Sequence, residues 1–170
     1  MRMVELVGRR SVNMVVLSEI TQMPSLHDLI TAVRDAGRNE PDAMITLTHH
    51  SDDSKWAQLL PDKINLSYPF GKSPSDLIAE LNFPHNEKAV AGFWDAELFA
   101  DFDTSSMTVD QLVQFLDQYL DAAFGTASLD DFAVSFDVAE RGTIKAESKS
   151  EFLRKIVQLK RYFEGRPTRN

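Results

Sequence analysis

The chain has 170 residues, of which 43% are hydrophobic, and it carries a formal net charge of −8. This length and composition fit one globular domain with an apolar core, and the 11 phenylalanines argue against a disordered chain. Because cysteine is absent, disulfides, thiolate nucleophiles and zinc–thiolate sites are excluded, and we expect a cytoplasmic protein.

The first third of the chain alternates between strand and helix signals. A β-branched run over 12–17 predicts a strand. Ser25, with Asp28 three residues later, opens a helix that is expected to end at Gly37. Three further short strands are predicted over 44–48, 56–60 and 64–68, with the last two joined as a hairpin.

The middle of the chain contains a short helix and a longer strand signal. Ser73 followed by Pro74 has the capping pattern of a helix start. In the segment 93–103 the even positions are apolar and most odd positions are acidic. This alternation predicts one long strand, with one face on a core and the other on solvent or a partner.

The last third adds two helices and one strand. Thr108 and Gln111 form a capping box for a helix that runs to Gly125, and the alternation over 132–139 predicts a strand. A fourth helix is predicted over 148–165, from Ser148 to a stop at Gly165.

Short turns between neighbouring strands favour hairpins over parallel crossovers. We therefore predict an α+β fold, with an antiparallel-rich or mixed sheet and about four helices packed mainly on one face. One domain is expected over 1–165, followed by a flexible basic tail at 166–170. Neither a signal peptide nor a run of about 18 apolar residues is visible, so we expect no membrane association.

Charge is distributed unevenly along the chain. Residues 1–140 sum to −14 and residues 141–170 to +6. Between Lys88 and Arg141 there is no basic residue, whereas eleven carboxylates occur there. Such asymmetry biases which partners approach the molecule without specifying its fold.

Catalytic and ligand-binding motifs are absent from the sequence. No glycine-rich phosphate loop, GxSxG or HExxH pattern occurs, and no cofactor, metal site or catalytic residue is predicted. Two alternatives for a small hydrolase remain open. Asp95 and Glu97 would lie about 6.5–7 Å apart on one strand face, and His49 and His50 stand next to two aspartates.

The basic C-terminal helix also leaves alternatives open. Its bases could contact phosphate groups or a partner protein, but the acidic chain as a whole would repel nucleic acid, which we do not expect as a partner. The helix could instead complement the acidic part of the same chain, or pack on a second copy to form a homodimer.

The acidic segment is the strongest candidate for a functional surface. Its strand acids surround one outward-facing aromatic residue, a pattern that suits a protein interface, and the following helix adds further acids. A solvated negative surface is the alternative interpretation. The predicted contact residues are Asp95, Glu97, Phe99, Asp101, Asp103, Asp117 and Asp121.

Residues 56–125 resemble the TY-Chap group, whose members are similar to type III secretion chaperones. The resemblance rests on the order and spacing of Trp56–Leu60, Ile64–Phe70, Ser73–Pro84, Gly92–Asp95 and the helix over 109–125. It covers about 40% of the chain and includes no signature motif. It implies a small α+β domain, often acidic, that binds a secreted effector or toxin of a bacterial system without catalysis.

These observations predict a non-enzymatic, chaperone-like or toxin-immunity-like protein. It would mask a basic bacterial effector or toxin with its acidic surface. A small hydrolase and an oligomerising structural protein are the alternatives.

Overall fold

The computed structural model describes residues 24–38 and 42–137. Their main elements are α2 (Leu26–Gly37), β1 (Met44–His49), β2 (Asp52–Leu59), β3 (Lys63–Ser67), α3 (Pro74–Glu80), β4 (Val90–Asp95), β5 (Phe99–Asp103), α4 (Val109–Phe124) and β6 (Phe132–Asp137). Short 3-10 turns at Asn86–Lys88 and Leu129–Asp131 precede β4 and β6.

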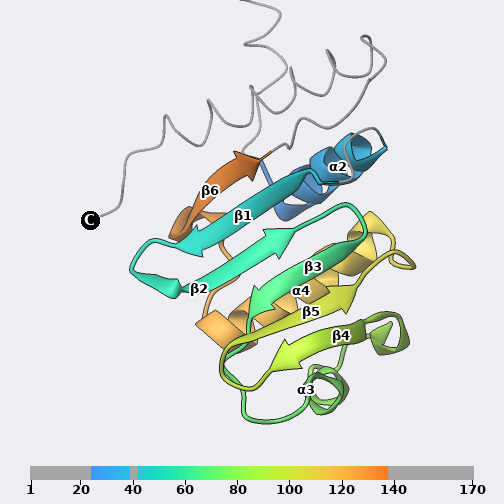
Figure 1. Cartoon of the computed structure of the whole chain (residues 1–170), viewed down its shortest axis with the longest axis vertical. Helices are drawn as coiled ribbons and strands as arrows, with labels where there is room; N and C mark the ends of the chain where they lie inside the picture. The colour runs from blue at the N-terminus through green and yellow to red at the C-terminus, as the bar shows by residue number, and fades with distance from the viewer. Residues whose placement is uncertain (1–23, 39–41, 138–170) are drawn as a thin grey trace, which may run out of the picture.

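The six strands form one sheet in the order β4-β5-β3-β2-β1-β6, and every neighbouring pair is antiparallel. Short connections join β1 to β2, β2 to β3 and β4 to β5. Helix α4 carries the chain from β5 to β6, which pairs with β1 at the far edge (Figure 1). Strands β4 and β6 are therefore the two edges of the sheet.

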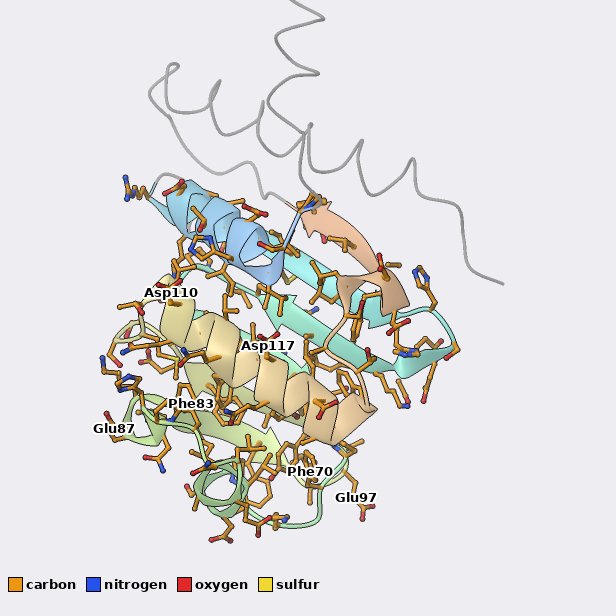
Figure 2. The ribbon with its side chains drawn as sticks, turned by 180° about the vertical axis from the view of Figure 1, so that it is seen from behind. Phe70, Phe83, Glu87, Glu97, Asp110 and Asp117 are labelled. Atoms are coloured by element: carbon orange, nitrogen blue, oxygen red, sulfur yellow. The ribbon has the colours of Figure 1, made fainter. Side chains whose placement is uncertain are left out.

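Helices α2 and α4 lie on one side of the sheet, and α3 lies beyond its β4 edge (Figure 1). α2 and α4 are neighbours across the same face, and α3 lies near β4 (Figures 1 and 2). Among the described residues, no element covers the opposite face, which we call the open face (Figure 1). The antiparallel sheet with α2 and α4 on one side confirms the predicted α+β class.

Three of the predicted helices are found at their predicted positions. Ser25 and Asp28 form the capping box of α2, and Thr108 and Gln111 form that of α4. Gly125 ends α4 with a φ of 78°, a conformation that glycine adopts without a Cβ penalty. The capping side chains each stabilise their helix by about 1 kcal/mol.

Three predicted segments lie outside the described residues. These are the strand over 12–17, the fourth helix over 148–165 and the tail over 166–170.

Aromatic rings from α4 fill the space between the helices and the sheet. Phe115 meets Phe102 of β5 edge to face, with the ring centroids 5.3 Å apart, and Tyr119 meets the same ring at 6.4 Å. The hydroxyl of the buried Tyr119 donates a hydrogen bond of 2.8 Å to the Ser67 carbonyl oxygen in β3. This bond ties α4 to β3.

The prediction of one long strand over 93–103 is wrong, because the chain turns within it. β4 ends at Asp95 and β5 begins at Phe99. The Leu98 amide closes the turn by donating to the Asp95 carbonyl oxygen at 3.1 Å. Glu97, at the tip, has a φ of 62°, in the left-handed region. No glycine or proline marks this turn in the sequence.

Replacing Tyr119 with phenylalanine should lower the free energy of unfolding by about 1–3 kcal/mol, since the buried Ser67 carbonyl oxygen loses a partner. Tyr68→Phe is the matched control. Its hydroxyl bonds to the Lys72 carbonyl oxygen in a loop, where water can replace it. Urea unfolding of both variants measures the difference, and equal losses would contradict a special role for the Tyr119 bond.

Candidate protein-binding surface

Three of the predicted contact residues lie on the open face of the sheet. In β5, Ala100 and Phe102 are fully buried. Since neighbouring side chains in a strand point to opposite faces, Phe99, Asp101 and Asp103 point to the open face.

Two more predicted residues lie close to these three. Asp95 is exposed at the end of β4 and pairs directly with Phe99, so the two share a face. Glu97 is exposed at the tip of the hairpin, where its amide donates to the Phe70 carbonyl oxygen at 3.3 Å. We call the five residues Asp95, Glu97, Phe99, Asp101 and Asp103 the acidic face.

Asp117 and Asp121 do not belong to this surface. Both are exposed on α4, which packs on the other side of the sheet. Figure 2, which shows the helix side, places Asp117 on the outer surface of α4. The expectation of one broad surface made of strand and helix acids is therefore wrong, because the sheet separates the two sets.

Asp103 is held by its own turn. Its Oδ1 accepts hydrogen bonds from the Ser105 hydroxyl at 2.6 Å and from the Ser105 amide at 2.8 Å. These bonds lower the pKa of the Asp103 carboxyl, because they favour its charged form. Asp103 therefore stays ionised under mildly acidic conditions.

Asp101 is more enclosed than the other acids of the face. It pairs with Asn65 across the β3–β5 ladder, and the Asn65 amide group donates to Gln58 Oε1 at 3.3 Å. The Oδ1 atoms of Asp101 and Asn65 are buried and have no hydrogen-bond partner. The Asp101 carboxyl lies against Gly92 of β4, where a Cβ atom would overlap with it.

On the helix side, partial desolvation raises the pKa of Asp117. The pKa of Asp103, by contrast, is lowered. The two acid sets thus differ in environment as well as in position.

The Asp95–Glu97 pair does not have the geometry expected of a hydrolase. Asp95 and Glu97 do not share a strand face, because Glu97 lies in the turn. His49 packs its ring on Phe132 at 5.5 Å, and its Nδ1 is 3.0 Å from the Ser51 hydroxyl. Asp52 accepts a hydrogen bond from the Ser54 hydroxyl at the start of β2.

Sequence analysis missed a group of exposed apolar residues at the sheet edge. The large hydrophobic side chains exposed in the described residues all lie in β4 or in the β4–β5 turn. We call them the edge strip: Val90, Phe93, Trp94 and Leu98. Alternation assigned Trp94 and Leu98 to the core. The adjacent aromatic pair Phe93 and Trp94 was the available signal, because neighbours in a strand cannot both face one core.

Comparison with protein-family models, with curated proteins and with solved structures finds no match for this chain. Among the described residues, no three histidine or carboxylate side chains are grouped to hold a metal ion. Within the same ranges, no helix has both the length and the apolar character to cross a bilayer.

Gly92→Ala should lower the free energy of unfolding by about 1 kcal/mol, the lower end of the overpacking range, because the new methyl group forces the end of the Asp101 side chain to move. Gly71→Ala is the matched control, since a Cβ there contacts nothing. Adding Asp101→Ser to Gly92→Ala should reduce the penalty, which a double-mutant cycle measures. Equal stability of Gly92→Ala and Gly71→Ala would contradict the close contact between Gly92 and the Asp101 carboxyl.

Ser105→Ala should raise the pKa of Asp103 toward its ordinary value of about 3.9. Because the folded pKa lies below the unfolded one, the Ser105 bonds stabilise the fold fully above that value. Their contribution disappears as the pH falls through the folded pKa. Carboxyl NMR titration measures the shift, with Ser106→Ala as control. An unchanged Asp103 titration in Ser105→Ala would contradict the assignment.

Proposed function

We propose that this chain is a non-enzymatic protein-binding module whose acidic face covers a basic partner. The observation that supports this most is that Phe99 is partly exposed on the open face, with Asp95 paired beside it and Asp101 and Asp103 on the same strand face. Aromatic residues surrounded by complementary charge are frequent at the centres of protein interfaces.

The charge balance supports a cationic partner. The described residues contain 19 aspartates and glutamates against six lysines and arginines. A field of this sign accelerates the approach of a basic protein and repels nucleic acid.

The arrangement of layers supports binding through the sheet. Because α2 and α4 occupy one side, a partner can approach the open face without displacing a described element. Binding would mask the partner sterically, and no bond would be made or broken.

The resemblance of residues 56–125 to the TY-Chap group adds a biological direction to the proposal. A chaperone-like or immunity-like role in the bacterial cytoplasm fits it, with a secreted effector or a toxin as the basic partner. The complete absence of cysteine suits this reducing compartment.

Two double variants with the same change in net charge test the proposal. Asp95→Lys with Glu97→Lys brings the charge of the acidic face from −4 to zero, and Asp117→Lys with Asp121→Lys makes the same change of four charges on the helix side. The first pair should slow association with the basic partner at least about tenfold and flatten its salt dependence, since steering charges act mainly on association. The second pair should bind almost like the unmodified chain.

The partner can be sought by affinity capture at low and high salt, and then measured by surface plasmon resonance. A basic protein retained by the unmodified chain and by the helix-side variant, but not by the face variant, is the expected result. Equal association rates for both double variants would refute the assignment of the face.

A further inference from the structure

The edge strip has features that the acidic face does not explain. Phe93 is 82% exposed, Leu98 61%, Val90 56% and Trp94 42%. These four exposed side chains are concentrated on a single edge strand and its turn. Isolated exposed hydrophobic residues are common on protein surfaces, but a cluster of them is not. A grouped set of this kind indicates a surface that is covered in the functional state.

The strip extends over both faces of β4. Val90 pairs with Asp103 and therefore lies on the open face, whereas Trp94 pairs with the buried Ala100 and lies on the helix side. A helix laid on one face would cover only part of the strip. A strand added along the edge covers both faces, because its own side chains alternate.

Among the described residues, the outer side of β4 carries no paired strand, although helix α3 contacts β4 and lies beyond this edge of the sheet in Figure 1. Of the described strands, β4 pairs only with β5, so its outer side forms one edge of the sheet. Unpaired strand edges of this kind are templates for another strand. A register irregularity between Ala91 and Trp94 keeps the regular stretch short, so the side chains must supply much of the affinity.

We propose that the occupant is a second copy of this chain, with the two β4 strands antiparallel about a two-fold axis between Gly92 and Phe93. The two sheets then form one continuous sheet. In this register Phe93 lies opposite Gly92 of the second copy, and Trp94 lies opposite its Ala91. Large side chains thus meet small ones, as a self-complementary interface requires.

The two Asp95 side chains repel each other only weakly in this pairing, although each copy carries a net charge of −8. Asp95 lies opposite Val90 of the second copy, which sets the two Asp95 side chains five residues apart along the strands. At about 3.4 Å a residue their separation is about 17 Å. The Debye length at physiological salt is about 8 Å, so their repulsion is largely screened.

The area is in the range that a dimer needs. The exposed parts of Phe93 and Trp94 amount to roughly 250 Å² a copy, taking about 150–250 Å² for each complete aromatic side chain. Val90, Leu98 and the strand backbone add to this. Two copies then approach the roughly 1,000 Å² that a specific interface buries.

This proposal does not depend on the proposed function, which uses the face of the sheet. A matched pair of variants separates them. Phe93→Ser changes the edge strip, and Phe99→Ser makes the same replacement on the acidic face. Circular dichroism checks that each variant is folded, and Val90→Lys provides a second, independent change in the strip.

Sedimentation equilibrium of the full chain over a range of concentrations measures the outcome. The unmodified chain, of 19.2 kDa, should reach twice that mass. Phe93→Ser should raise the dimer dissociation constant about thirtyfold or more, because each dimer carries the change twice. Phe99→Ser should leave it within about threefold. Amide hydrogen exchange should show protection of β4 that increases with protein concentration.

Three results would overturn the proposal. They are a chain that stays monomeric at all concentrations, a dimer that survives both Phe93→Ser and Val90→Lys, and a dimer without added protection at β4. A dimer that survives both variants would point instead to the predicted helix over 148–165. Loss of partner binding in Phe99→Ser with an intact dimer would leave the edge proposal standing.

Discussion

The burial of the apolar face of α4 against the sheet sets the position of this helix, and the hydrogen bond from the Tyr119 hydroxyl to the Ser67 carbonyl oxygen anchors it to β3. The ring of Tyr119 packs against Phe102 and Phe115, so the polar contact lies in an apolar layer where water cannot replace it. Arg34 of α2 adds a second tie, by donating to the Thr104 and Met107 carbonyl oxygens just before α4. The two helices are thereby held on the same side of the sheet.

Because α2 and α4 share one side, the molecule has two chemically different surfaces to offer. The open face presents carboxylates beside a partly exposed ring, and the β4 edge presents apolar side chains. Charge acts over a Debye length and chiefly influences the encounter rate, whereas apolar contact acts at short range and chiefly influences the lifetime of a complex. The two surfaces therefore suit different kinds of association.

Edge and face are coupled through the contact between Gly92 and Asp101. The glycine belongs to the edge strand and the carboxyl to the acidic face, and each occupies space that a larger neighbour would need. If the edge pairs with a second copy, the open faces of the two sheets adjoin. A basic partner would then meet two sets of carboxylates, with the multivalent gain that such an arrangement gives when both sets can be reached together.

Local signals in the sequence predicted most of the elements. Capping residues located the starts of α2, α3 and α4, because the bonds that satisfy the first turn of a helix involve residues only three apart. Alternation located β1, β3 and β6, since one buried face imposes a period of two. The short connections between strands correctly favoured an antiparallel sheet.

The sequence could not locate the turn at Glu97, because alternation across 93–103 reads the same for one strand as for a hairpin. The contacts that hold this turn come from the segment after β3, through the Tyr68 amide and the Phe70 carbonyl oxygen. Tertiary packing likewise decided that the sheet lies between Asp117 and the strand acids, and that Trp94 is at an edge. The sequence by itself therefore determined which elements form, since their signals are local, and only the tertiary structure determined which side chains share a surface.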